Sequence, residues 1–206
     1  CVSALCLGAD IVVQSLHKTL PALTQTALCH TRSELVSEKY LEESLHIFET
    51  SSPSYIFMAG IDACIRYMAD SDKEMISYIN NLFEFRNSTK VFKHIHLWED
   101  DSTIGYDFTK LVIYSDMIDG ITLADILRSS YNIETEMSKL KFVLAYSTVC
   151  DSKDDFAGLY NALKDIDENF SYMEKKPLAN LNKKYLGKVA EDNIYIYPPG
   201  VPVLKK

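Results

Sequence analysis

The sequence predicts an α/β protein, and two patterns in it carry that prediction. Short apolar runs rich in β-branched residues, which are typical of strands, recur at 11–13, 110–115 and 141–148. Between them lie longer segments whose apolar residues recur every three or four positions, as in amphipathic helices. A mostly helical stretch gives way partway along the chain to alternating strands and helices. We therefore predict two domains, residues 1–88 and residues 89–206.

In the first domain, the hydrophobic pattern predicts two short strands followed by three helices. The strand at 11–13 is apolar enough that we expect it to be buried, and a second short strand follows at 27–30. Helices are predicted over 38–48, 54–69 and 72–86. The positions expected to face the core are Leu41, Leu45, Phe48, Ile56, Gly60, Ala63, Tyr67, Met75, Ile79, Leu82 and Phe83.

In the second domain, strands and helices alternate. After the strand at 110–115, Asp119 and Gly120 mark a turn, and Thr122 is a candidate cap for a helix over 123–131. The strand at 141–148 precedes another helix, which begins at Ser152 or Asp154 and runs to about residue 169. Residues 171–188 are basic and irregular, and a last short strand is predicted at 193–197.

Length and composition are those of a globular protein. The chain has 206 residues, of which 47% are hydrophobic and 24% charged, so it is long enough to bury a core. A net charge of −8 argues against non-specific binding of nucleic acid, and no apolar run reaches the length of a membrane span. The five cysteines are scattered without a Cys-x-x-Cys pair. We interpret them as reduced thiols of a cytoplasmic protein and predict no metal site.

The loop that follows the first strand carries three chemically useful side chains. Ser15, His17 and Lys18 place a hydroxyl, an imidazole and an amine at the end of a strand, where α/β proteins often present reactive groups. From residue types alone, Lys18 fits either a catalytic lysine or a surface lysine. His17 fits either a site residue or a structural histidine that is hydrogen-bonded within the loop.

Two further groups of residues are candidate sites. Ser51 and Ser52 lie in a hydroxyl-rich loop before a predicted helix N-terminus, which suits either an anion site or simple helix capping. His94 and His96 are two positions apart on a predicted strand, so both point to one face. Without an evident third ligand, exposed strand histidines are favoured over a metal site.

The segment 9–27 resembles the pyridoxal-phosphate lysine segment of the ornithine/lysine/arginine decarboxylase family. It reads Ala-Asp-Ile-Val-Val-Gln-Ser-Leu-His-Lys-Thr-Leu-Pro-Ala-Leu-Thr-Gln-Thr-Ala. The resemblance continues at 50–55, at 107–111 and at 197–202, in the family's order. One departure is Phe108, where the family has proline. The resemblance implies the C-terminal part of a fold-type I pyridoxal-phosphate-dependent large domain, followed by a small α+β domain that is truncated at its C-terminus.

The same resemblance assigns roles to the loop residues. It makes Lys18 the lysine that forms the internal aldimine with pyridoxal 5'-phosphate and later carries a proton to the substrate. It makes Ser15 a phosphate ligand and places His17 near the phosphate or the substrate carboxylate. Ser51 and Ser52 would reach the phosphate of a neighbouring subunit, which implies a homodimer or a higher homo-oligomer. An imine-forming lysine must be neutral when it reacts, so we expect an environment that lowers its pKa.

The reaction implied is decarboxylation of a basic amino acid, either arginine, lysine or ornithine, to the amine used in polyamine synthesis. The family's Asp-x-x-His segment, which holds the cofactor ring, and its upstream phosphate loop are not found in the sequence. We therefore expect a fragment that lacks the N-terminal half and binds the cofactor poorly by itself. The alternatives are a non-catalytic fragment of such an enzyme, or another fold-type I enzyme such as an aminotransferase.

Overall fold

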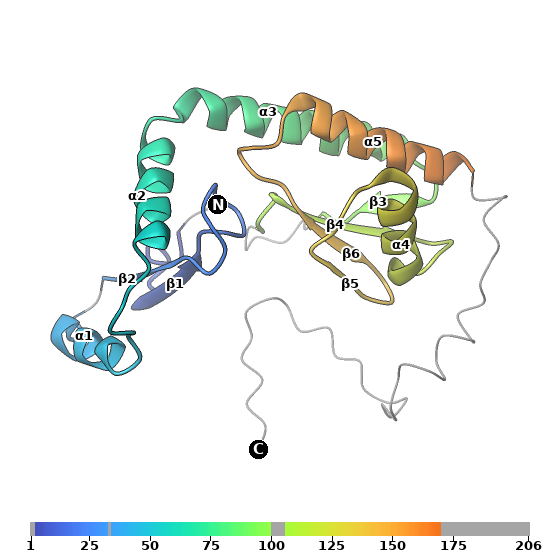
Figure 1. Ribbon diagram of the computed structural model, residues 1–206. Coiled ribbons are helices and arrows are strands. Elements are labelled where there is room, and N and C mark those ends of the chain that lie inside the picture. The colour runs from blue at the N-terminus through green and yellow to red at the C-terminus, as the bar shows by residue number, and fades with distance from the viewer. Residues whose placement is uncertain (1–2, 33, 100–105, 170–206) are drawn as a thin grey trace, which may run out of the picture. The chain divides into compact units, whose positions relative to one another are not determined.

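The structure is a computed structural model that describes residues 3–32, 34–99 and 106–169 (Figure 1). These residues belong to the first of two units of the chain, and the second unit begins at Met173. The predicted strand at 193–197, the basic stretch at 171–188 and the motif at 197–202 lie outside the described residues. The elements, in chain order, are β1 (Ile11–Ser15), β2 (Ala27–Thr31), α1 (Glu38–His46), α2 (Tyr55–Ala69), α3 (Asp72–Ser88), the 3-10 turn η1 (Thr89–Val91), β3 (Ile95–Leu97), β4 (Lys110–Ser115), α4 (Gly120–Tyr131), β5 (Met137–Ser138), β6 (Val143–Tyr146) and α5 (Lys153–Glu168).

Strands β1 and β2 form an antiparallel hairpin in which Val13 lies opposite Cys29. Both strands were predicted, but the expectation that the first is buried was wrong. The side chains of Ile11 and Val13 are 41% and 70% exposed. The reason is topological, because β1 and β2 form a two-stranded sheet whose faces receive little cover from the described residues. Burial is concentrated instead at the loop end of the hairpin.

Helices α1 and α2 are largely solvent-exposed. No residue of α1 is buried, so its predicted apolar stripe is exposed, and Phe48 lies beyond the end of the helix at 88% exposure. In α2 the buried residue is Cys64. Gly60, which was expected to face the core, lies close to the loop, because a Cβ at that position would lie 3.3 Å from the side chain of Leu23. Helix α2 therefore touches the loop that carries Lys18.

Helix α3 buries Leu82 as predicted, but the rest of its buried face differs from the one expected. Its buried residues are Tyr78, Leu82, Phe85 and Arg86, whereas Phe83 is 48% exposed and stacks on Phe108 at 5.2 Å between ring centroids. Contacts on two sides of α3 determine which of its faces is buried. Aromatic residues meet α5, which runs alongside α3 in Figure 1. On the other side, the guanidinium of Arg86 donates to the backbone carbonyls of Phe108 and Lys110, at 3.0 and 3.1 Å.

The remaining strands form a four-stranded antiparallel sheet in the order β3-β4-β6-β5. Alternation along β4 places Leu111 and Ile113 on one face, and both are fully buried. Strand β5 was not predicted, because it is only two residues long. The other fully buried hydrophobic side chains around this sheet and its helices are Leu82, Ile95, Leu123, Leu127, Val143, Leu163 and Ile166.

Helix α4 begins earlier than predicted. Its cap is Asp119, whose side chain accepts hydrogen bonds from the backbone N–H groups of Ile121 and Thr122, both at 2.9 Å. The candidate cap Thr122 is instead inside the first turn, where its hydroxyl donates to the same carboxylate. Gly120, expected in a turn, is the first helical residue, and its N–H donates to the carbonyl of Leu140 at 3.0 Å. Aspartate is the stronger cap here because its two oxygens serve three donors.

Helix α5 starts where the sequence indicated and ends one residue before the predicted limit. Ser152 and Asp155 form a reciprocal capping box, so Ser152 rather than Asp154 is the cap. The helix packs on α3 through aromatic pairs, with ring centroids of Phe85 and Phe156 5.6 Å apart. None of the described helices is both long and apolar enough to cross a membrane.

The C-terminal end of α5 is fastened to the strand β3 region by one carboxylate. Asp167 is buried and accepts three backbone hydrogen bonds, from Lys93 at 3.0 Å, His94 at 2.7 Å and Ile95 at 2.9 Å. Burial alone would raise the pKa of Asp167, but the three N–H donors outweigh it and hold the pKa below its ordinary value of 3.8. The carboxylate thus replaces the backbone partners that these N–H groups lack.

We expect Asp167→Asn to destabilise the fold by about 2–3 kcal/mol, because an amide can no longer accept at both oxygens and its NH₂ faces a backbone donor. Since the folded-state pKa is lowered, the advantage of the wild type is complete above the unfolded pKa and is lost as the pH falls through 3.8 and below. Urea unfolding at neutral pH and at pH values near and below 3.8 measures this. Glu168→Gln, at an exposed pair with Lys164, is the matched control. Equal stability losses in both variants would contradict the role given to Asp167.

Candidate functional site

The loop that carries Lys18 is closed by a single buried residue, Thr26. Its backbone carbonyl accepts from the N–H of Leu16 and from Nδ1 of His17, both at 3.0 Å. Its hydroxyl donates to the carbonyl of Leu23 at 2.6 Å. Thr26 and Leu16 are 1% and 3% exposed, so these bonds are shielded from water. The position of Lys18 is therefore fixed by the residues on both sides of it.

The structure gives His17 a structural role in this loop. A carbonyl oxygen can only accept, so Nδ1 of His17 carries the hydrogen and donates it to Thr26. In the neutral ring this leaves Nε2 as an acceptor. The hydrogen bond is the one expected of a structural histidine, and the predicted contact of His17 with a phosphate or a carboxylate stays a prediction.

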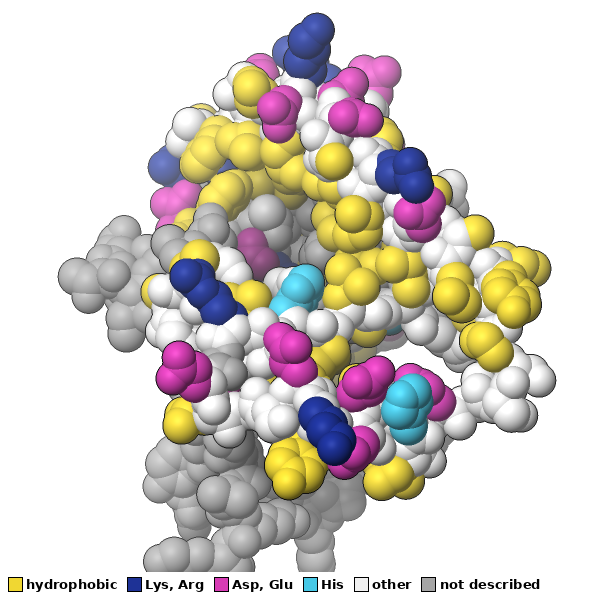
Figure 2. All heavy atoms as spheres, turned by 90° about the vertical axis from the view of Figure 1, so that its left-hand side faces the viewer, with side chains coloured by type: hydrophobic (Ala, Val, Ile, Leu, Met, Phe, Trp, Pro, Cys, Tyr) yellow, Lys and Arg dark blue, Asp and Glu magenta, His cyan; other side chains and the backbone are white. Residues whose placement is uncertain are grey.

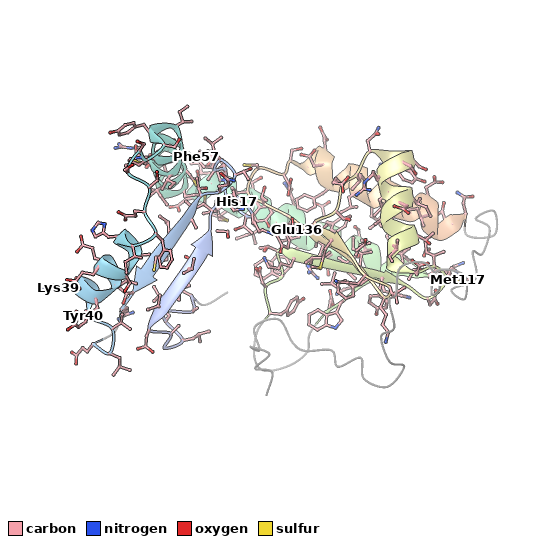
Figure 3. The ribbon with its side chains drawn as sticks, turned by 60° about the horizontal axis from the view of Figure 1, so that its bottom comes forward. His17, Lys39, Tyr40, Phe57, Met117 and Glu136 are labelled. Atoms are coloured by element: carbon pink, nitrogen blue, oxygen red, sulfur yellow. The ribbon has the colours of Figure 1, made fainter. Side chains whose placement is uncertain are left out.

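The amine of Lys18 forms an ion pair with Glu136, which immediately precedes β5. The two side chains are 45% and 34% exposed. Figure 3 labels Glu136 and also His17, the residue that precedes Lys18 in the chain. The ring of Tyr146 also faces the Lys18 amine, with 5.8 Å between Nζ and the ring centroid. Residues 118 positions apart in the chain thus meet at this amine.

The environment of Lys18 differs from the one expected. We predicted that its pKa is lowered, but the hydrogen bond and the charge of Glu136 raise the pKa of Lys18 above its ordinary value of 10.5. Burial acts in the expected direction and is outweighed, because Lys18 is exposed at the end of the hairpin. In the structure Lys18 is therefore an ammonium ion at neutral pH.

A second lysine shares the aromatic ring. Lys110 lies opposite Tyr146 in the ladder between β4 and β6, and its amine is 4.2 Å from the ring centroid. Asp107 pairs with this amine at 3.3 Å. Burial acts to raise the pKa of Asp107, but bonds from Thr109 and the charge of Lys110 outweigh it and lower the pKa. The cluster around Tyr146 therefore contains two cations and two carboxylates.

The other predicted cofactor residues are not joined to Lys18 by side-chain contacts in the described structure. Ser15 is the last residue of β1, is exposed and lies opposite Ala27 in the hairpin. Ser51 and Ser52 are exposed in the loop before α2, where the N–H of Ser52 donates to the hydroxyl of Thr50 at 3.3 Å. Their assignments to cofactor phosphate stay predictions.

His96 lies in β3 and His94 directly before it, and among the described residues no group of three or more potential metal ligands is found. Nδ1 of His94 lies 3.2 Å from a carboxylate oxygen of Asp116, and the ring of His96 packs on Tyr114 at 5.2 Å. These local partners account for both histidines as surface residues of the sheet.

Sequence reasoning missed Glu136 and Tyr146. Glu136 lies in a polar stretch before a two-residue strand, and Tyr146 ends a strand predicted only for its apolar residues. No motif or spacing near either residue distinguishes it from a surface residue. Their importance appears only when the fold brings them to the amine of Lys18.

The sequence profile described as the Orn/Lys/Arg decarboxylase major domain matches residues 2–118. This range contains the whole lysine loop and more than half of the chain. The chain belongs to the Orn/Lys/Arg decarboxylase family. The resemblance found in the segment 9–27 is thereby confirmed.

Curated relatives from this family match the chain over nearly its full length. The arginine decarboxylases of Bacillus anthracis and Bacillus subtilis are 28% and 27% identical to it, over 98% of the chain in each case. The matched region is 48% of each relative. The chain therefore spans about half the length of the curated relatives it matches.

Solved structures of the same family share the fold. The lysine decarboxylase of Francisella novicida matches 79% of the chain and 28% of its own, with a TM-score of 0.66 and 16% identity. The constitutive lysine decarboxylase of E. coli matches 79% of the chain and 29% of its own, with a TM-score of 0.65 and 16% identity. At this identity the likeness concerns the fold, and it confirms a mixed fold of helices and sheets.

Proposed function

We propose that the full-length protein is a pyridoxal-phosphate-dependent decarboxylase of a basic amino acid and that Lys18 is its cofactor-binding lysine. The observation that carries the proposal is the placement of Lys18. Within a segment that matches the family profile, its amine lies at the end of a strand, is 45% exposed, and is held by a loop closed through Thr26. A reactive lysine needs this combination of fixed position and access.

The residues present fit the cofactor in the part of the site they form. The Lys18 amine is accessible to an aldehyde, and Ser15 offers a hydroxyl on the same end of the hairpin. When bound, the cofactor supplies an electron sink for the pair released as carbon dioxide leaves. To bind it, Lys18 must give up its proton and its contact with Glu136. An exposed ion pair of this kind separates readily in water.

The substrate class follows from the relatives and from the charges near Lys18. Curated relatives are named arginine decarboxylases and solved neighbours lysine decarboxylases, so a basic amino acid is the common class. Once Lys18 has given up its proton to bind the cofactor, the carboxylates of Glu136 and Asp107 outnumber the remaining cation, Lys110, and this net negative charge suits a cationic substrate. We also propose the family's division into a large domain ending near Ser88, where α3 ends, and a small domain beyond it.

We propose that the enzyme is a homodimer or larger homo-oligomer. Support comes from the face formed by α1, α2 and the segment between them. Figure 2 shows hydrophobic side chains gathered there. Exposed members include Tyr40, Phe48, Tyr55 and Ile56, at 71%, 88%, 78% and 73%. Contiguous exposed apolar surface of this kind marks a protein contact. The loop with Ser51 and Ser52 lies on the same segment, so a partner covering it would meet these hydroxyls.

A cytoplasmic location is part of the same proposal. The described cysteines, Cys6, Cys29, Cys64 and Cys150, are all free thiols. Reduced thiols are typical of proteins kept in a reducing compartment.

The test is a substrate panel on the full-length protein. The purified protein is incubated with pyridoxal phosphate and, separately, with arginine, lysine and ornithine, and both carbon dioxide and the amine product are measured. We expect conversion of at least one of the three. A keto acid in place of the amine would favour an aminotransferase. Yellow colour without turnover of any of the three would favour a non-catalytic protein and overturn the proposal.

A further inference from the structure

Among the contacts of the described residues, the ion pair between Lys18 and Glu136 is not explained by the need to bind a cofactor. Binding an aldehyde requires a neutral amine, whereas Glu136 holds the amine as an ammonium ion. The contact is specific in geometry, because a carboxylate oxygen accepts directly from Nζ and the Tyr146 ring faces the same amine at 5.8 Å. A carboxylate and an aromatic face are the two groups that stabilise an ammonium.

The proposed reaction gives Lys18 a second task, in which it must be charged. After carbon dioxide leaves, the substrate carbon needs a proton, and the Lys18 amine is a donor that the proposed function places in the site. A donor works best when it is protonated and held in one orientation. Glu136 provides both conditions at the atom that would donate.

We propose that Glu136 is a positioning residue that holds Lys18 as an oriented ammonium for proton delivery to the α-carbon of the substrate. This inference rests on the proposed function. In the step, one N–H bond of the Lys18 ammonium breaks and one C–H bond forms on the carbon that lost carbon dioxide. The electron pair left by the broken carbon–carboxylate bond becomes the C–H bond. Lys18 is left as a neutral amine, and Glu136 remains ionised throughout.

The other groups that face Lys18 from neighbouring elements are consistent with Glu136 as the residue that holds the ammonium. Tyr146 on β6 adds a cation-binding face. Lys110 on β4 binds the same ring but is matched by Asp107, which limits its repulsion of Lys18. His17, on the loop itself, donates from Nδ1 to the carbonyl of Thr26. Glu136 is thus the carboxylate bonded to the amine, and its removal is the sharpest test.

The first experiment measures the charge state of Lys18 without any cofactor. The cofactor-free full-length protein is labelled with a trace of acetic anhydride at a series of pH values, and acetylation of the Lys18 peptide is quantified by mass spectrometry. We expect Glu136→Gln to lower the pKa of Lys18, so that acetylation of Lys18 begins at lower pH than in the wild type, since the substitution removes the hydrogen-bonded charged partner. Glu134→Gln is the matched control. Glu134 is an exposed carboxylate two residues away that accepts a 2.7 Å hydrogen bond from Arg128. Removing its charge should leave the pKa of Lys18 unchanged.

The second experiment asks whether the charge serves the reaction. With its preferred amino acid, the Glu136→Gln enzyme should lose roughly tenfold or more in kcat with little change in KM, because orientation and protonation of the donor are lost. The fall in kcat at high pH should begin at lower pH than in the wild type. The yellow colour on adding pyridoxal phosphate should also develop at lower pH. A merely structural role for Glu136 would move neither profile.

The two experiments separate failure of this inference from failure of the proposed function. If the wild type converts none of the three amino acids, the proposed function fails, whereas labelling still reports on the ion pair. If the wild type is active but Glu136→Gln labels and reacts like Glu134→Gln, the inference on Glu136 is overturned. Both substitutions conserve side-chain size at exposed positions, so unchanged thermal melting is expected and confirms folding.

Discussion

Lys18→Ala will abolish decarboxylation and cofactor colour while leaving the fold intact. The side chain is 45% exposed and its partner Glu136 lies at the surface, so removing it leaves no buried charge or cavity. The chemistry, in contrast, loses the amine that is proposed to bind the cofactor and to donate the proton. We expect the turnover number to fall by about 10³-fold or more. Amine production and the visible absorption of the full-length protein with added pyridoxal phosphate measure the two effects.

The matched control for this experiment is Lys39→Ala. Lys39 is an exposed lysine of α1 that pairs with Glu43 at 3.9 Å, so it shares the charge and exposure of Lys18 but not its position. Colour and turnover should equal those of the wild type. If Lys18→Ala retains both colour and turnover, another amine binds the cofactor and the assignment of Lys18 is wrong.

Gly120→Ala will destabilise the fold more than an alanine at any other glycine of the described residues, because the added methyl group meets backbone atoms. A Cβ at Gly120 would lie 2.3 Å from the carbonyl oxygen of Lys139 and 2.4 Å from that of Phe142. These are backbone atoms held by the hairpin that joins β5 and β6, so they cannot move aside as a side chain would. We expect a loss of about 3 kcal/mol or more, or a fall in Tm of roughly 10 °C. Urea and thermal unfolding measure it.

Gly158→Ala serves as the opposite control. Gly158 lies within α5, and no atom outside its own helix lies within 4 Å of an added Cβ. Alanine favours the helix by about 1 kcal/mol over glycine, so this variant should be as stable as the wild type or more stable. A similar loss in both variants would mean that contact with the Lys139 and Phe142 carbonyls is not what requires glycine at position 120.

Local pattern was sufficient for much of the fold and for the placement of Lys18 in the loop after β1. Strand β1, the helices and the start of α5 follow from periodicity and capping, which depend on neighbours a few residues away. The motif around Lys18 is equally local. Its loop is closed by Thr26 only eight residues later, so the segment 9–27 contains most of what fixes the lysine backbone.

The features that the sequence did not predict depend on contacts between distant segments. The prediction that β1 is buried was wrong. Burial of a strand depends on what covers its sheet, and not on the apolar character of side chains such as Val13. The prediction that Phe83 lies on the buried face of α3 was wrong. Arg86 is buried instead, because its guanidinium donates to backbone carbonyls at and just before the start of β4. The pKa direction at Lys18 was wrong because Glu136 comes from a segment with no distinguishing pattern.

The single carbonyl of Thr26 has a consequence for how this loop tolerates change in length. It fixes both Leu16 and His17, so Lys18 is held next to the fastened end of the loop and not at its free middle. Extra residues placed between Leu20 and Leu23 would lengthen only the far side, and the entropy of closing a slightly longer loop is small. Insertions in that stretch should therefore leave Lys18 in its place next to Leu16 and His17.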